Sequence, residues 1–121
     1  GLMVTASCHC GAVQLEIDLP DEPLSPVRCN CSYCIRRGAA MIGVPLKALR
    51  VVRGAENLQL YTFHSNTAQH YFCKTCGIYT HHRRRIDTQQ YGVNIGCIEG
   101  LDVKALGEIP WLDGRNHPSD A

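Results

Sequence analysis

Cysteine is the residue type in this chain that offers the most chemistry, because eight cysteines occur among its 121 residues. Seven fall in three short groups and one stands alone: Cys8 with Cys10, Cys29 with Cys31 and Cys34, Cys73 with Cys76, and Cys97. Thiolates this close in sequence are typical ligands of Zn²⁺, which sulfur holds at about 2.3 Å. A disulfide framework is the alternative, and it is disfavoured because we expect the chain to reside in a reducing compartment.

The first and last groups predict a closed zinc site. They are two short pairs far apart in sequence, the usual arrangement of a structural site, and we call them the four-cysteine cluster: Cys8, Cys10, Cys73 and Cys76. Such a site ties the first strand to the middle of the chain, so metal-binding energy becomes folding energy. The plainer alternative is that these four side chains are only buried apolar groups.

The middle group, called here the three-cysteine cluster, has an odd number of ligands. Cys29, Cys31 and Cys34 supply three sulfurs, and three protein ligands with a vacant fourth position are typical of a catalytic zinc site. Two alternatives stay open: Cys97 or a histidine completes the site, or the three thiols bind no metal. Cys97 ends a strand-like run, and we expect it to pack as a small apolar side chain.

The segments around these cysteines have the pattern of short strands joined by loops. Residues 12–19 alternate between apolar and polar side chains, which predicts a half-buried strand, and a loop with three prolines follows at 20–26. Further strands are expected at 39–44, 49–54, 57–63, 67–72, 77–82 and 90–96, and short helical turns at 32–38 and 101–106. The tail from 111 is polar and turn-rich. The prediction is a mainly β single domain over residues 1–121, stapled by zinc at its turns.

Charge and hydropathy exclude several classes of protein. The formal charge of +1 gives no electrostatic case for a nucleic-acid or anionic-membrane partner. The basic run His81 to Arg85 is expected to be an exposed hairpin end, or else a patch that recruits an acidic ligand. No run approaches the roughly 18 apolar residues of a membrane span, and the first twenty residues lack the basic start and apolar run of a secretory signal. We therefore expect a cytoplasmic protein.

Four motifs resemble a known family: CHCGAVQLEI, RCNCSYCIRRGA, AQHYFCKTCGIYTHH and YGVNIGCIEG. Their order and cysteine spacing, from about Cys8 to Gly100, are similar to those of the glutathione-dependent formaldehyde-activating enzymes, which include centromere protein V. The resemblance implies the β-rich, zinc-stapled fold of the Rab-interacting guanine-nucleotide-exchange suppressors. It also implies two zinc ions per chain, a structural one on the four-cysteine cluster and a catalytic one on the three-cysteine cluster. The implied activity joins glutathione, the co-substrate, to formaldehyde to give S-(hydroxymethyl)glutathione.

Other residues near the motifs have a type suited to this chemistry. Arg36 and Arg37 directly follow the three-cysteine cluster, where they would offset its negative charge or bind a glutathione carboxylate; the alternative is a solvated pair. His70 is the preferred group to move a proton to the new hydroxyl, ahead of its histidine neighbours, and its alternative is a half-buried strand histidine. Asn116 and His117, in the segment DGRNHP, are further candidates, which we expect to close over the site.

Two functions are compatible with these features. The first is a zinc-dependent carbon–sulfur lyase or synthase whose partners are glutathione, or a related thiol, and formaldehyde or another small electrophile. The second is a non-catalytic zinc-binding interaction module, which needs only the four-cysteine cluster. The three additional thiols favour the enzyme, because a scaffold has no use for them. The sequence carries no signal for an oligomeric state.

Overall fold

A five-stranded sheet is the largest element of the computed structural model, which describes residues 1–116. Its strands are antiparallel, in the order β4 (Met41–Pro45), β9 (Gln90–Asn94), β8 (Tyr79–Arg83), β7 (Gln69–Cys73) and β6 (Leu58–Tyr61). All five lie within one residue of segments that the sequence predicts as strands. Strand β8 is the central one, and four of its five residues are buried.

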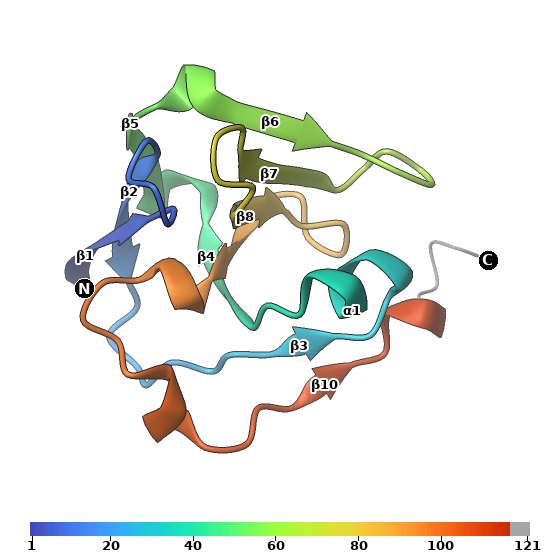
Figure 1. Ribbon diagram of the computed structural model, residues 1–121. Helices are drawn as coiled ribbons and strands as arrows, with labels where there is room; N and C mark the ends of the chain where they lie inside the picture. Colours follow the sequence, from blue (N-terminus) through green and yellow to red (C-terminus); the bar gives the residue numbers. More distant parts are fainter. Residues whose placement is uncertain (117–121) are drawn as a thin grey trace.

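A three-stranded antiparallel sheet packs beside it (Figure 1). Its order is β1 (Leu2–Ser7), β2 (Gln14–Leu19) and β5 (Leu49–Arg53). The predicted alternation in β2 is confirmed, because Leu15, Ile17 and Leu19 are buried while the residues between them are not. Strand β1 lies outside the predicted strands, and it forms by pairing with β2 along its whole length.

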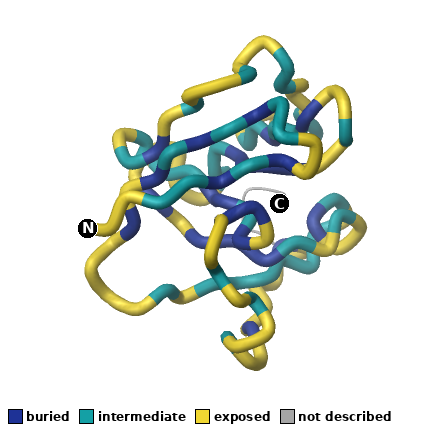
Figure 2. Tube along the Cα trace, turned by 60° about the vertical axis from the view of Figure 1, so that its left-hand side comes forward, coloured by how far each residue is buried: buried dark blue, intermediate teal, exposed yellow. Residues whose placement is uncertain are grey.

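The apolar core joins these two sheets. Its fully buried members come from both of them and include Leu15, Ile17, Val44 and Val93. Figure 2 shows burial concentrated along the strands, while the connecting loops are exposed. Cys97 is part of this core, as predicted, and burial raises the pKa of its thiol to about 11. Cys97 therefore remains a protonated, packed side chain near neutral pH.

A third, two-stranded sheet and one short helix form the end of the molecule that carries the three-cysteine cluster. Strand β3 (Arg28–Cys29) pairs in parallel with β10 (Trp111–Leu112), and helix α1 (Ser32–Arg37) follows β3 directly (Figure 1). The helix was predicted as a helical turn. Cys31 caps its N-terminus, and Gly38 caps its C-terminus with a φ of 70°, in the left-handed region that favours glycine.

Five 3₁₀ turns complete the described chain: η1 (Leu46–Ala48), η2 (Ala55–Asn57), η3 (Ile95–Cys97), η4 (Val103–Leu106) and η5 (Gly114–Asn116). The predicted turn at 101–106 is confirmed as η4, and the proline-rich loop at 20–26 contains no strand. The fold class is mainly β, as expected. A single domain over 1–121 stays a prediction, and His117 lies outside the described residues. Within residues 1–116, no helix is long and apolar enough to span a membrane.

Candidate metal centres and active site

The four-cysteine cluster lies where two tight turns meet. Cys8 and Cys10 belong to the turn after β1, whereas Cys73 ends β7 and Cys76 lies in the turn that follows. The four Sγ atoms lie within 4.8 Å of one another. The Sγ of Cys10 is 3.7 Å from that of Cys8 and 3.7 Å from that of Cys73. Two sulfurs bound tetrahedrally to one zinc lie about 3.8 Å apart, so this donor set fits Zn²⁺.

Hydrogen bonds to these sulfurs also fit metal-bound thiolates. The backbone N–H of Val13 donates to Sγ of Cys8 at 3.3 Å. Cys73 accepts from the side-chain amide of Asn57 at 3.3 Å and from the backbone N–H of Thr75 at 3.4 Å. Such donors stabilise the negative sulfur that a metal ligand must be. The hydrogen-bond donors come from three separate segments, whereas a bound ion would join the two turns that carry the cysteines.

The three-cysteine cluster is built by one strand end and one helix start. Cys29 ends β3, Cys31 caps α1, and Cys34 lies in its first turn. The backbone N–H of Cys34 donates to Sγ of Cys31 at 3.3 Å, and that of Cys31 donates to Sγ of Cys29 at 3.5 Å. The three Sγ atoms lie within 4.8 Å of one another, which also fits one metal ion. The cysteine spacing therefore does bring three sulfurs to one point.

Nothing among the described residues closes this second cluster. No fourth cysteine, histidine, aspartate or glutamate of residues 1–116 joins the three within the same 4.8 Å limit. Cys97, one of the two candidates considered for the fourth position, is in the hydrophobic core. Cys34 is buried, whereas Cys29 and Cys31 are half-buried. The donor set therefore offers a metal three sulfurs and one open side.

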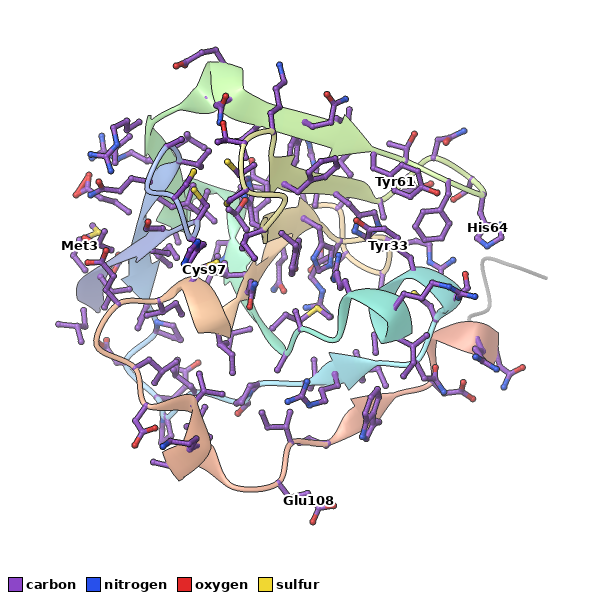
Figure 3. The ribbon with its side chains drawn as sticks, in the orientation of Figure 1. Met3, Tyr33, Tyr61, His64, Cys97 and Glu108 are labelled. Carbon is purple, nitrogen blue, oxygen red and sulfur yellow. The ribbon has the colours of Figure 1, made fainter. Side chains whose placement is uncertain are left out.

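A cavity of about 590 Å³ lies on that side. The three cysteines line it together with His70 and His82 from the large sheet, Phe63 and His64 from the loop after β6, and Arg84, Arg85 and Arg115. Figure 3 shows Tyr33, Tyr61 and His64 gathered at this end of the molecule, away from Cys97. The rings of Tyr33 and Tyr61 stack at 5.1 Å. Neither tyrosine lines the cavity, which combines the rings of Phe63, His64, His70 and His82 with three arginines and the three thiols.

His70 is held in one orientation and one protonation state. Its ring lies between those of Phe63 and His82, with centroids 5.4 and 5.2 Å away. Arg37 Nη1 lies 2.9 Å from its Nδ1. Because a guanidinium only donates, Nδ1 must accept and Nε2 carries the ring proton. Burial first, and then the charge of Arg37, lowers the pKa of His70 to about 4, so its imidazole is neutral at neutral pH. Nε2 has no hydrogen-bond partner within residues 1–116.

The two predicted arginines have different surroundings. Arg36 is exposed, and its Nη1 donates to the carbonyl oxygen of Ser32 at 2.6 Å. Arg37 turns inward instead, with its guanidinium 3.6 Å from the ring centroid of Tyr79. Its Nε and Nη2 are buried without a hydrogen-bond partner in the described chain, and no carboxylate there forms an ion pair with it. Neither arginine lines the cavity.

The basic run His81 to Arg85 is not an exposed hairpin end, and that expectation is wrong. His81 and His82 are 3% and 7% exposed, because β8 lies between two other strands. Their Nδ1 atoms find partners within the sheet, the hydroxyls of Thr80 at 2.8 Å and Tyr79 at 2.6 Å. Burial lowers the pKa of both histidines, that of His81 to about 4. The arginines of the run are partly exposed, and two of them, Arg84 and Arg85, line the cavity.

Sequence reasoning missed several residues of the cavity. Phe63 and Arg115 line it and were not named for this role, whereas His82 and Arg84 were considered as members of the basic run His81 to Arg85. One signal was present in the sequence: Gly92, on the strand next to β8, where any Cβ would overlap the ring of His82. A glycine inside a strand indicates close approach of another group, in this case that ring.

Comparisons with known proteins point to one family. The model of the family described as glutathione-dependent formaldehyde-activating enzyme matches residues 3–109. A protein of Emericella nidulans named for the same enzyme is 30% identical over 96 residues, which are 76% of this chain and 48% of the relative. The chain therefore spans about half the length of that relative. A crystal structure of a Rhodobacter sphaeroides protein is similar with a TM-score of 0.86 and 53% identity, covering 89% of this chain and 99% of that one.

Proposed function

The chain belongs to the glutathione-dependent formaldehyde-activating enzyme family, and we propose that it joins the thiol of glutathione to formaldehyde or another small aldehyde. The product is an adduct of the S-(hydroxymethyl)glutathione type, and the reverse reaction makes the protein a carbon–sulfur lyase. The observation that carries the proposal is the three-cysteine cluster, whose open side faces the cavity lined by arginines. A cytoplasmic location and two zinc ions per chain are parts of the same proposal.

The reaction is the addition of a thiolate to a carbonyl. The sulfur attacks the aldehyde carbon and forms the C–S bond, the C=O π electrons move to oxygen, and that oxygen then takes up a proton. Free thiols have a pKa of about 8.5, so little thiolate is present at neutral pH. A zinc ion held by Cys29, Cys31 and Cys34 would supply a position at which the glutathione sulfur loses its proton.

Arg37 supplies the positive charge that such a site needs. Three thiolates around one divalent ion leave a net negative centre, and a fourth sulfur adds to it. Arg37 follows Cys34 by three residues of α1 and carries a buried cation with no carboxylate partner in the described chain. A buried charge is costly unless an opposite charge compensates it, so the cysteine cluster and Arg37 stabilise each other. Arg36, exposed and bonded to its own helix, is not given this role.

His70 is proposed to act through the N–H at Nε2. The aldehyde oxygen becomes negative as the sulfur adds, and a fixed N–H donor stabilises that charge. His70 lines the cavity with the three cysteines, and the bond from Arg37 to Nδ1 keeps the proton on Nε2. A neutral imidazole in this state donates a hydrogen bond, and transfer of a proton to the new hydroxyl requires a further donor such as water.

The charge of the cavity supports glutathione as the thiol. Glutathione carries two carboxylates, and guanidinium groups bind carboxylates with charge-assisted hydrogen bonds. Arg84, Arg85 and Arg115 line the cavity, against the single carboxylate of Asp113. We assign the carboxylate-binding role to these three residues in place of the predicted Arg36 and Arg37, because the latter two do not line the cavity.

The test is turnover by the full chain loaded with zinc. Loss of free glutathione thiol after mixing with formaldehyde should be faster than the spontaneous reaction, in proportion to protein concentration. Arg84→Gln should raise KM for glutathione by about tenfold, the loss of one charge-assisted contact, and leave the rate with a small neutral thiol unchanged. Arg50→Gln, on β5 and paired with Glu16 far from the cavity lining, is the matched control. No acceleration by protein that carries both zinc ions would favour the non-catalytic module.

A further inference from the structure

The segment Trp111–Asn116 lies directly against the three-cysteine cluster, although it is beyond residues 3–109 that the family model matches. Its strand β10 pairs in parallel with β3, with Leu112 opposite Cys29 (Figure 1). The backbone N–H of Arg28 donates to the carbonyl of Pro110 at 2.8 Å, and that of Asn30 to the carbonyl of Leu112 at 3.2 Å. Strand β3, which carries Cys29, therefore has β10 as its only partner strand in the described chain.

A group of side-chain hydrogen bonds extends this pairing to the residue between Cys29 and Cys31. The side-chain amide of Asn30 donates to Oδ1 of Asp113 at 3.2 Å. In return, the backbone N–H of Arg115 donates to Oδ1 of Asn30 at 3.2 Å, and its Nε donates to the carbonyl of Asn30 at 3.1 Å. Each bond is exposed and individually weak, but the three together fix the backbone at Asn30. Asn30 in turn sets the relative position of the cysteines on either side of it.

Gly114 brings the segment into contact with the sulfurs themselves. It is buried, and a Cβ at this position would lie 2.5 Å from Sγ of Cys29 and 2.9 Å from Cβ of Cys31. Real Cβ atoms do not approach other atoms so closely, so any side chain here must displace a cysteine or the segment. The φ of Gly114 is not in the left-handed region, so the requirement is for space and not for an unusual backbone conformation.

We propose that residues 111–116 complete the three-cysteine site and that Gly114 is its positioning residue. The segment holds the sulfurs of Cys29 and Cys31 at metal-binding separation from one side. Leu112 to Arg115 also line the cavity together with the three cysteines, so the segment that contacts the sulfurs forms part of the cavity wall beside them. The inference rests on the proposed function in one respect, that the cluster holds an exchangeable zinc ion.

The experiment compares zinc affinity at the two clusters in the full chain. Chelator competition on wild-type protein, Gly114→Ala and Asp113→Ala would resolve a tightly held zinc on the four-cysteine cluster and a second zinc on the three-cysteine cluster. Loss of residues that orient metal ligands costs about 10- to 100-fold in affinity, and we expect a loss of this size for the second zinc only. Gly96→Ala is the control, because Gly96 also has an ordinary φ and its Cβ would meet only a side-chain oxygen, at 3.2 Å.

A second readout does not require the second zinc. In protein that carries zinc on the four-cysteine cluster alone, Gly114→Ala should change the alkylation rate of Cys29 and Cys31 by at least threefold, while Gly96→Ala leaves it unchanged. If Gly114→Ala does not fold, as judged by amide exchange of β2 and β9, Asp113→Ala decides the question. Folded variants with wild-type affinity and wild-type alkylation rates would overturn the inference. A wild-type chain that never binds the second zinc would overturn the proposed function instead, and the alkylation rates would still test the role of Gly114.

Discussion

Replacement of Arg37 by methionine tests the contact between Arg37 and His70, a residue of the cavity lining. Methionine keeps much of the length and apolar volume of the arginine side chain, but it removes the charge and the donor to Nδ1 of His70. We expect the pKa of His70 to rise in Arg37→Met. Burial is the main cause of the low wild-type pKa of about 4 and persists in the variant, so the new pKa should stay below the ordinary value of 6.5.

The size of the change follows from the short contact. Arg37 Nη1 lies 2.9 Å from Nδ1, which places the centre of the guanidinium charge roughly 5 Å from the imidazole ring. At an effective dielectric constant of about 20, two unit charges at that distance repel by about 3 kcal/mol, equivalent to about two pKa units. Solvent in the cavity and the nearby thiolates reduce this, so we expect a rise of about one to two units.

The assay is imidazole NMR on zinc-loaded protein, following His70 between pH 8 and pH 5. Wild-type His70 should remain neutral over this range, whereas the variant should begin to titrate. Arg36→Met is the matched control, because Arg36 is the adjacent residue, is equally charged, and within residues 1–116 donates its hydrogen bond to the carbonyl of Ser32 and not to His70. An unchanged His70 pKa in Arg37→Met, or the same rise in both variants, would refute the reasoning.

Three further predictions concern the metal clusters and acid stability. Cys73→Ser should unfold the chain, because the binding free energy of a structural zinc ion is about 10–16 kcal/mol and the whole free energy of unfolding of a typical domain is about 5–15 kcal/mol. A normal melting transition in this variant would contradict the four-cysteine zinc site. Cys31→Ser should keep the fold, by amide exchange, and lose one zinc and the turnover of glutathione; global unfolding would show that the second cluster is structural. The pKa of His81 is about 4 when folded and 6.5 when unfolded, so the unfolded chain binds more protons as pH falls from 6.5 toward 4. The free energy of unfolding that His81 contributes above pH 6.5 is therefore lost in that window, by up to about 3 kcal/mol. Measured by denaturant unfolding, the free energy of unfolding of His81→Gln should fall less over the same pH range than that of wild type.

The local patterns in the sequence predicted most of the strands and both cysteine clusters. Period-two alternation is a direct consequence of a strand with one buried face, so residues 12–19 could be assigned from their own side chains. Cysteine spacing likewise reflects the short distances between metal ligands, and Cys29 to Cys34 were assigned in the same way. The strands and the three-cysteine cluster depend on residues that are neighbours in sequence. The four-cysteine cluster also required two such pairs to be joined across 63 residues, which the need of a closed zinc site for four ligands supplied.

The rest depends on partners far away in the chain. Residues 111–112 become a strand only because β3 offers a free edge, and Gly114 matters only because two cysteines lie against it. His81 and His82 look exposed in a basic run, but the central position of β8 buries them and the hydroxyls of its own residues satisfy them. The sequence shows whether a side chain is polar or apolar. Whether a polar side chain on a strand is buried depends on which strands lie beside it in the sheet.

The zinc content of the purified, reduced full chain tests the central claim most directly. It is measured by elemental analysis against amino-acid quantitation, before and after incubation with added zinc. We predict close to two zinc ions per chain, one on each cysteine cluster. A value that stays at one after added zinc would contradict the claim, because the three-cysteine cluster would then hold no metal for glutathione to meet.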